Sequence, residues 1–286
     1  MDDARVGALF VLCSGAGFGT LGVLGVVAGD AGLSIPTVLF LRFSLATVVV
    51  WAALAVRGEL RRLRGRNLLV GVALGAFGYA AMSGLYFLGL EFMTAGMVGI
   101  VLYTYPAFVL VLAAVFLGEP VGRRSVAALG STLGGVALVT GADPAVADPI
   151  GVGIVLLAAA VYATYITASR TTLEDVSAPT LTAHVMPAAA GTFLVIGLAT
   201  DSLSMPSGVV GWGAVVAIAV VATALPIFAF FAGLSRIGAG PAAILSAVEP
   251  VVTVLLGALL LGELVSAAVV VGGGLVLVGV VVVPRR

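Results

Sequence analysis

The chain is a succession of long apolar runs separated by short polar connections. Ten runs of roughly 18 to 25 mainly apolar residues are each long enough to cross the ~30 Å hydrocarbon core of a bilayer. We expect helices, because a chain in lipid must satisfy its backbone polar groups internally and the alternating pattern of barrel strands is missing. The expected spans are 6–28, 35–56, 68–89, 93–117, 125–141, 149–168, 178–199, 209–233, 238–261 and 265–283. The pattern therefore predicts an all-α polytopic membrane protein with ten transmembrane helices.

Composition agrees with a protein that lies almost wholly in the membrane. The chain is 62% hydrophobic and 9% charged, whereas soluble domains are about 25% charged. The longest polar segment, around residues 57–67, is too short for a soluble domain, so function is expected within the membrane or its short loops. The first apolar run exceeds the usual core of a signal peptide and is counted as a span. The single cysteine, Cys13, cannot form an intrachain disulfide.

Arginine is distributed very unevenly among the connections. With the N-terminus inside, the cytoplasmic side holds all the arginines except Arg42, namely Arg5, Arg57, Arg61, Arg62, Arg64, Arg66, Arg123, Arg124, Arg170, Arg236, Arg285 and Arg286. The charged residues of the opposite connections are all acidic. They are Asp30, Glu91, Asp143, Asp148, Asp201 and Glu263. The positive-inside rule then places both termini in the cytoplasm. The lysine-free, Ala/Val/Gly-rich composition favours a prokaryotic cytoplasmic membrane as the location.

The absence of lysine excludes several kinds of chemistry. A Walker A loop needs a lysine for the nucleotide phosphates, and a pyridoxal site needs one for its Schiff base. Neither can be built from this chain, so it cannot hydrolyse ATP through a P-loop of its own. Paired aspartates in facing spans, an HExxH motif and a Ser/His constellation are also missing. We expect no enzyme activity, no cofactor and no metal, and the zero net charge gives no reason to expect a nucleic-acid partner.

The sequence contains an internal repeat. Moving the second half back by 144 positions aligns "AGMVGIVLYTYPAFVLVLAAVFLGEP", from Ala95, with "AGPAAILSAVEPVVTVLLGALLLGEL", from Ala239. The same offset places "FGT" at 18–20 over "YAT" at 162–164. Each repeat holds five predicted helices, and an odd number forces equivalent helices to cross in opposite senses. Inverted repeats are a natural way to build two access states around a central site.

The repeated Pro and LGE spacing, together with "FLRF" at 40–43, resembles the EamA branch of the drug/metabolite transporter superfamily over essentially the whole chain. The resemblance implies EamA-like repeats at 5–143 and 147–284. It also implies that helices 1 to 4 and 6 to 9 surround a central cavity, with helices 5 and 10 at the periphery. Such transporters move amino acids, sugars, nucleotide precursors and other metabolites, and the resemblance leans toward export. The chain departs from symmetry where Glu249 faces Tyr105 in the alignment.

Glu249 and Tyr105 are the first candidates for a binding site. At ~1.5 Å per residue, each lies near the middle of its span. Both precede a proline, Pro250 or Pro106, whose missing N–H and ring clash interrupt the helix, and such interruptions mark sites in repeat transporters. A charge there costs ~2.5–3.5 kcal/mol, so Glu249 must face a partner or water, or be protonated. It is interpreted as a substrate or proton site, or as a neutral group that pins two helices.

Two further ionisable groups lie within spans. Arg42 lies about six residues into the second span, where it can pair with carbonyls or a carboxylate, or contact an anion directly. His184, the only histidine, can titrate near neutral pH or serve as a satisfied structural group. Aromatic side chains are candidates for the cavity wall because buried hydroxyls need partners. They are Phe18, Tyr79, Tyr86, Tyr103, Tyr162 and Tyr165.

The glycines and the LGE glutamates are interpreted structurally. Small residues allow membrane helices to approach closely, so helices 5 and 10, which hold the densest glycine runs, are expected to contact each other. Glu119 and Glu263 lie at span ends and are expected to solvate or cap helix ends.

The leading hypothesis is therefore a secondary transporter that moves a small metabolite, such as an amino acid, by alternating access. A proton gradient or exchange would drive it. The alternatives are a passive channel or facilitator, for which a continuous polar stripe is missing, and a membrane-embedded enzyme. The expected partners are the small-molecule substrate and the lipid bilayer, with the chain as a monomer.

Overall fold

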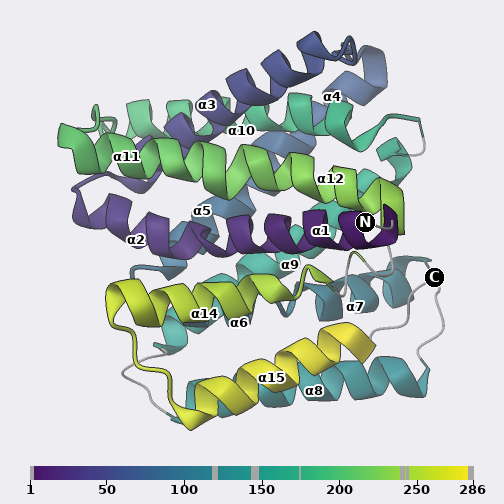
Figure 1. Cartoon of the computed structure of the whole chain (residues 1–286), viewed down its shortest axis with the longest axis vertical. Helices are drawn as coiled ribbons and strands as arrows, with labels where there is room; N and C mark the ends of the chain where they lie inside the picture. The colour runs from purple at the N-terminus through teal and green to yellow at the C-terminus, as the bar shows by residue number, and fades with distance from the viewer. Residues whose placement is uncertain are drawn as a thin grey trace.

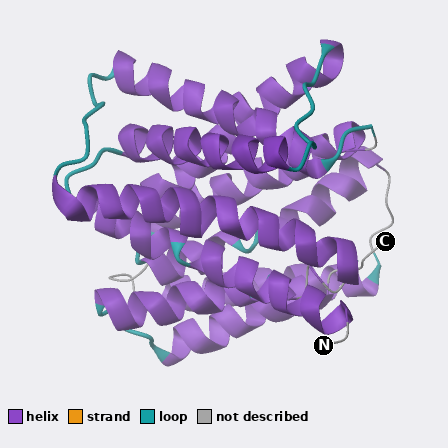
Figure 2. Cartoon of the chain, turned by 45° about the horizontal axis from the view of Figure 1, so that its top comes forward, coloured by secondary structure: helices purple, strands orange, loops and turns teal. Residues whose placement is uncertain are grey.

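The computed structural model describes residues 3–117, 122–142, 148–173, 175–238, 242 and 245–282. Over these residues the regular structure is helical throughout, without a strand (Figure 2). In the first half the helices are α1 (Asp3–Gly19), α2 (Leu21–Asp30), α3 (Ile35–Val56), α4 (Gly65–Ala73), η1 (Leu74–Tyr79), α5 (Ala80–Gly89), α6 (Ala95–Leu102), α7 (Tyr105–Leu117) and α8 (Arg123–Ala142). In the second half they are α9 (Pro149–Leu173), α10 (Ala178–Ala199), α11 (Gly208–Ala219), η2 (Val220–Ala224), α12 (Leu225–Ile237), α14 (Val248–Leu261) and α15 (Ala267–Val282).

Many of these helices are long and apolar enough to cross a bilayer. Within the described residues seven such segments occur, which are Asp3–Asp30, Ile35–Val56, Gly65–Gly89, Ala95–Phe116, Pro149–Ser169, Ala178–Ala199 and Gly208–Ile237. Shorter apolar helices cover Val126–Leu138, Val248–Leu261 and Ala267–Gly279. The prediction of an all-helical, multi-pass membrane protein is confirmed at this level.

Several of the long segments are interrupted within their apolar stretch. The first breaks at Thr20, between α1 and α2, and two others contain π-helical turns, η1 and η2. Turns at 103–104 and 246–247 precede α7 and α14, whose first turns contain Pro106 and Pro250. A proline fits the first turn of a helix because the N–H there has no intrahelical acceptor. The irregular backbone at these points leaves polar groups for other partners.

Helix packing follows the internal repeat. The strongest pairings are α1 with α12, α3 with α10, α5 with α9, and α8 with α15. Moved by 144 positions, α1 overlaps α9 and α5 overlaps α12, so the α1–α12 and α5–α9 contacts are equivalent. The π-helical turns η1 and η2 overlap under the same shift. Figure 1 shows the helices lying roughly alongside one another, with α8 and α15 together at one edge.

The α8–α15 pair is held by close backbone approach. Ser131 Oγ donates a hydrogen bond to the carbonyl of Leu275, 2.7 Å away. A Cβ added at Gly135 would lie 2.5 Å from the carbonyl oxygen of Gly272, so a larger residue cannot fit there without movement. The expected contact between the two glycine-rich helices is confirmed, and small residues produce it as membrane helix packing requires.

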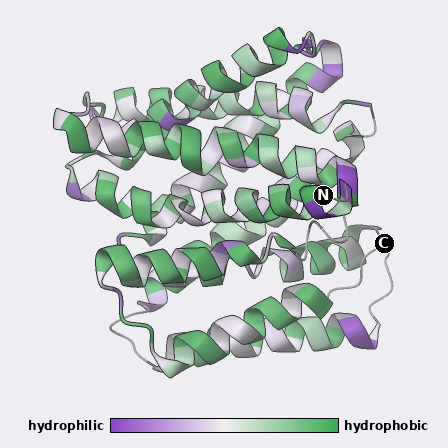
Figure 3. Ribbon diagram, in the orientation of Figure 1, coloured by the Kyte–Doolittle hydropathy of each residue, from purple (hydrophilic) through white to green (hydrophobic). Residues whose placement is uncertain are grey.

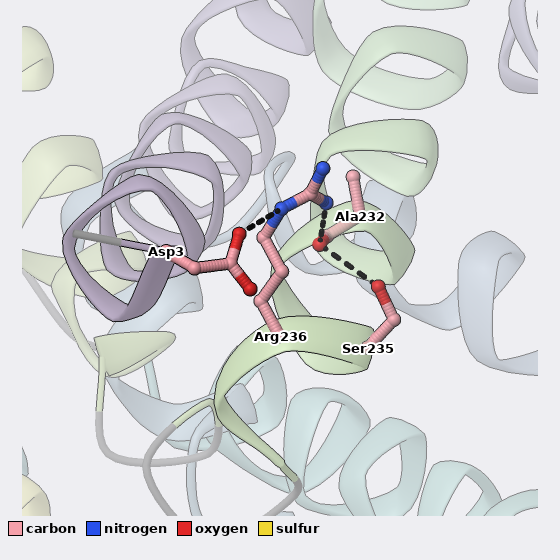
Figure 4. Close-up of polar contacts among 4 residues, drawn as sticks. All are labelled: Asp3, Ala232, Ser235 and Arg236. Carbon is pink, nitrogen blue, oxygen red and sulfur yellow. Dashed lines mark hydrogen bonds and ion pairs between the residues drawn. The ribbon is translucent and has the colours of Figure 1, made fainter. Parts of the chain in front are cut away.

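The beginning of α1 is tied to the end of α12. In Figure 4, Asp3 Oδ1 lies 3.3 Å from Arg236 Nε, and Arg236 also donates from Nη1 to the carbonyl of Ala232, as the Ser235 hydroxyl does. The Arg236 guanidinium stands over the ring of Phe10, 5.3 Å from its centroid. These contacts join the two halves of the chain at the end where α1 starts.

Glu263 connects the halves through a helix cap. Its carboxylate accepts hydrogen bonds from the backbone N–H groups of Ala95 and Gly96, at 2.6 Å and 3.0 Å. These are unpaired donors at the N-terminus of α6, where negative charge is also favoured by the helix dipole. The expected capping role is confirmed for Glu263, while Glu119 lies outside the described residues.

The outer surface is strongly apolar. Large hydrophobic side chains such as Phe77, Phe116 and Leu259 are more than half exposed. Figure 3 shows hydrophobic residues along most of the length of the helices, with the hydrophilic segments mainly near their ends. An apolar surface of this extent is unfavourable in water and favourable in contact with lipid.

Candidate functional site

A cavity of about 270 Å³ lies among the helices of both halves. This is near the lower end of the usual size of small-molecule sites. The side chains around it are aromatic or apolar with a few polar groups. They are Ser14, Gly15, Phe18, Leu21, Arg42, Tyr79, Met82, Ser83, Tyr86, Tyr103, Tyr105, Tyr162, Tyr165, Thr182, Val185, Met186, Ile227, Phe230, Phe231, Ser246 and Glu249. Neither α8 nor α15 contributes to this described lining.

The structure brings nearly all the sequence candidates together at this cavity. Glu249, Arg42, Phe18 and the six tyrosines line it, and His184 is the single candidate outside the described lining. The prolines that follow Tyr105 and Glu249 are not among the described lining residues and lie in the first turns of α7 and α14. The wall is therefore formed in part at interrupted helices.

The lining repeats with the same offset of 144 as the sequence. Pairs related by this shift both line the cavity. They are Phe18 with Tyr162, Leu21 with Tyr165, Arg42 with Met186, Ser83 with Ile227, Tyr86 with Phe230, and Tyr105 with Glu249. Two of these pairs contain an ionisable residue, and each of those residues has an uncharged counterpart: Met186 for Arg42 and Tyr105 for Glu249. The two halves thus form one cavity with matching positions but different polarity.

Glu249 is bonded to the hydroxyl of Tyr103. That hydroxyl lies 2.9 Å from Glu249 Oε2 and 2.7 Å from the carbonyl oxygen of Ser246. A phenol has one hydrogen to donate, so it cannot serve both acceptors at once. When Glu249 carries a proton, it can donate to Tyr103 while Tyr103 donates to Ser246. When Glu249 is ionised, the Tyr103 hydrogen is drawn to the carboxylate, and the Ser246 carbonyl, in the turn before α14, loses this donor.

A row of tyrosine rings continues from this hydrogen bond. The centroids of Tyr103 and Tyr105 are 5.7 Å apart, and those of Tyr105 and Tyr162 are 4.8 Å apart. Tyr162 stacks on Tyr165 at 6.1 Å, and Tyr165 contacts Tyr79 at 5.5 Å. Edge and stacked contacts of this kind hold rings in fixed orientations. The row presents aromatic faces with hydroxyl tips around the cavity.

Arg42 is buried, at 2% exposure, and lies in α3. Its Nε donates to Thr223 Oγ1, 2.9 Å away in η2, and its guanidinium lies 4.9 Å from the centroid of the Phe43 ring. Within the described part of the chain, neither Arg42 nor Glu249 forms an ion pair. The cavity therefore holds a base and an acid that do not neutralise each other directly.

His184 lies on another side of α10. Its Nε2 accepts a hydrogen bond from the backbone N–H of Leu63, and its Nδ1 lies 2.9 Å from the carbonyl of Thr180. Because Nε2 is the acceptor, the ring hydrogen belongs on Nδ1, which donates to Thr180. This arrangement ties the connection between α3 and α4 to α10. It gives His184 a structural contact in place of a cavity position.

Sequence reasoning missed the hydroxyl residues of the wall, Ser14, Ser83, Thr182 and Ser246. Serine and threonine are common in membrane helices, so their presence alone carries no signal. For Ser83 the internal repeat gives a signal once Ile227 is known to line the cavity. Ser83 lies 144 positions before Ile227 and is therefore its equivalent in the first half. Among the residues that the structure describes, no group of His, Cys, Asp and Glu is placed to hold a metal ion.

Comparison with known proteins gives consistent results. A sequence model of the EamA-like transporter family matches residues 5–141 and again residues 149–284. An uncharacterized transporter of Archaeoglobus fulgidus is 28% identical, covering 86% of this chain and 87% of its own. The uncharacterized transporter YcbK of Bacillus subtilis is 28% identical, covering 95% and 90%. A probable terminal-alkyne amino-acid exporter of Streptantibioticus cattleyicolor is 26% identical, covering 90% and 85%.

The fold has a counterpart among solved structures. One crystal structure superposes with a TM-score of 0.70 at 21% identity, covering 96% of this chain and 95% of the other. At this identity the match speaks for the fold alone.

Proposed function

Because the chain belongs to the EamA-like transporter family, we propose that it is a secondary-active transporter that exports a small metabolite, an amino acid or a related compound, by alternating access. The substrate would bind in the cavity between the halves, and the two halves would rock around it. The Streptantibioticus cattleyicolor relative, a probable amino-acid exporter, supports both the substrate class and the direction.

The observation that carries this proposal is the position of Glu249. Glu249 lines a cavity formed by both halves and lies in the first turn of α14, directly after the turn at 246–247. Polar groups at interrupted helices are where repeat transporters bind substrates and coupling ions. A carboxylate in a membrane interior costs free energy, so its presence there supports a functional role.

The proposed architecture is ten transmembrane helices in two inverted repeats, residues 5–143 and 147–284. The equivalent packing of α1–α12 and α5–α9, the overlapping π-helical turns and the matched cavity positions support the repeat. An odd number of helices in each repeat supports the inversion, since the second copy must then enter from the other side. The interruptions before Pro106 and Pro250 would act as hinges.

The proposed topology places both termini on the cytoplasmic side of the cell membrane. The beginning of α1, the α3–α4 connection, the beginning of α8 and the end of α12 lie at the same end of the molecule in Figure 1. These segments, with the first turn of α4, contain the described arginines other than Arg42 and Arg170. Such clustering supports a cytoplasmic position for that end.

The proposed energy source is the proton gradient, with Glu249 as the group that carries the proton. The Tyr103 hydroxyl connects the state of this carboxyl group to the Ser246 carbonyl and hence to the turn before α14. Loss or gain of a proton would change which partner that hydroxyl serves. The same event would therefore alter both the charge in the cavity and the hydrogen bonding at a proposed hinge.

The test is transport by purified protein in proteoliposomes with an imposed pH gradient. A panel of L-amino acids would first be screened for thermal stabilisation, and a labelled hit would then be followed. Glu249→Gln keeps the shape and a hydrogen-bonding side chain but cannot release a proton. We expect it to abolish accumulation driven by the gradient, with a change in stability within about 1 kcal/mol.

Glu91→Gln is the matched control, because Glu91 is exposed in the connection after α5. It should accumulate substrate like the unaltered protein. Equal, equally pH-sensitive accumulation by Glu249→Gln would contradict the proton role. Flux that rises linearly with concentration and ignores the gradient would favour the passive facilitator.

A further inference from the structure

The guanidinium of Arg42 donates a hydrogen bond from Nε, whereas its two terminal nitrogens form none within the described residues. Its Nε–H is used by Thr223 Oγ1. Within the described part of the chain, no hydrogen bond is formed by its two terminal nitrogens, although the residue is only 2% exposed and lines the cavity. A buried guanidinium normally has its donors paired. The free edge of this fork thus has space in the cavity and no protein partner.

Thr223 fixes the direction of that fork. Its side chain is fully buried, and its hydroxyl donates its hydrogen to the carbonyl of Ile218, five residues earlier, at 2.8 Å. With its hydrogen used, Oγ1 can only accept, and the donor it receives is Arg42 Nε–H. The carbonyl five residues back is within reach where η2 departs from the α-helix. The π-helical turn therefore holds the acceptor that orients Arg42.

Ser83 is a second unpaired polar group on the same cavity. It is 1% exposed, and its hydroxyl is one of two buried side-chain groups in the described residues without a hydrogen-bond partner; the other is Thr167. Ser83 lines the cavity, whereas Thr167 is outside the described lining. An unpaired buried hydroxyl costs stability, so one on a residue that lines the cavity has a reason to be there if a ligand completes it.

We propose that the terminal nitrogens of Arg42 and the hydroxyl of Ser83 bind the carboxylate of the transported molecule, with Thr223 as the positioning residue. This inference rests on the proposed transport function and deepens it. A planar carboxylate matches the two parallel donors of a guanidinium fork. A doubly charged phosphate fits less well, because the cavity offers one arginine and also holds the acidic Glu249. The aromatic wall would surround the rest of the ligand.

The experiment measures binding to the purified full-length chain by thermal shift and calorimetry. Three matched sets of probes are used: L-amino acids, the amines that lack only the carboxylate, and the carboxylic acids that lack only the amino group. Inorganic phosphate is a fourth probe. We expect at least one carboxylate-bearing probe to bind, and its amine counterpart to bind at least about tenfold more weakly.

Ser83→Ala is the most telling variant, with Thr167→Val as its matched control. Each removes a buried, unpaired hydroxyl, so neither should reduce the stability of the free protein. Ser83→Ala should weaken carboxylate binding about fivefold, and Thr167→Val should not change it. Arg42→Gln should weaken it more than about tenfold. Thr223→Val should weaken carboxylates selectively and leave amine binding unaltered, which a general loss of packing would not do.

The outcomes separate the carboxylate site from the transport proposal. Amines that bind as well as their amino acids, equal effects of Ser83→Ala and Thr167→Val, tighter binding of phosphate, or no binding by any carboxylate-bearing probe would each overturn the site. Binding of carboxylates without an amino group, dependent on Arg42, would support the site and contradict an amino-acid substrate. Binding that depends on Arg42, without flux in proteoliposomes, would support the site and contradict transport.

Discussion

At the scale of single residues, the cavity is organised by two charges kept apart. Arg42 is held by Thr223 on one side, and Glu249 is held by Tyr103 on another. Direct ion pairing would cancel both charges and leave a ligand little to bind. A molecule that carries both a cation and an anion could satisfy them together, which fits an amino acid.

The Tyr103 hydroxyl gives the first prediction at this scale. Tyr103→Phe removes the group shared by Glu249 and Ser246 while keeping the ring contact with Tyr105. We expect a loss of about 1 kcal/mol of stability, because a buried hydrogen bond is lost. Thermal unfolding in detergent measures it. Tyr86→Phe is the control, because no hydrogen bond to the Tyr86 hydroxyl is found among the described residues. Equal losses in the two variants would contradict the account.

At the scale of helices, a scaffold is distinguished from the cavity wall. The α8–α15 pair depends on small residues at a tight contact, and the described cavity lining contains no residue of either helix. By contrast, the cavity wall includes Tyr105 of α7 and Glu249 of α14, two helices that begin directly after turns. It also includes Tyr79 of the π-helical turn η1. The edge pair is thus regular, whereas the wall combines regular helices, such as α3 and α9, with irregular ones.

Adjacent glycines in α8 test this division. Gly135→Ala would bring a Cβ to 2.5 Å from the carbonyl oxygen of Gly272, whereas for Gly134→Ala no described atom lies within 4 Å. Both gain the same helix propensity, up to about 1 kcal/mol. We expect Gly135→Ala to be less stable than Gly134→Ala by about 1–3 kcal/mol, because only the first overpacks the contact. Thermal unfolding measures this, and equal stabilities would contradict the packing.

Helix type and position could be predicted from the sequence, and local backbone irregularity could not. Apolar length set the spans, and the helical rise placed Tyr105 and Glu249 at similar depth, where both meet the cavity. Depth alone does not give the direction in which a side chain points, so the sequence left His184 either as a titratable site or as a structural group, and in the structure it bonds to Leu63 and Thr180 outside the described lining. The π-helical turns and the break at Thr20 have no comparable signal, because packing between helices decides them.

At the scale of the whole molecule, a frame with repeated helix contacts encloses an asymmetric centre. Two equivalent helix pairs, α1–α12 and α5–α9, each join one half to the other, while the acid and the base of the cavity each occur once. Symmetry of the frame would allow two similar outward and inward states, and asymmetry at the centre would allow one oriented ligand. The repeat could be found by alignment, but the residues that fix Arg42 required coordinates.

The orientation in the membrane is tested by labelling single cysteines after Cys13→Ala. Arg62→Cys lies in the α3–α4 connection, and Met205→Cys lies between α10 and α11; both positions are exposed. With an impermeant maleimide, we expect intact cells to label Met205→Cys and inside-out vesicles to label Arg62→Cys. The charge distribution is the reason, because arginine-rich connections stay in the cytoplasm. The reverse pattern would contradict the proposed topology.

The most direct test of the central claim is counterflow through the purified protein. Proteoliposomes would be loaded with an unlabelled amino acid that stabilises the protein, and uptake of the labelled compound would be compared with that into empty vesicles. A carrier that alternates around one cavity returns faster when loaded, so internal substrate should raise initial uptake severalfold, and uptake should saturate. Uptake that internal substrate leaves unchanged, and that does not saturate, would contradict alternating access.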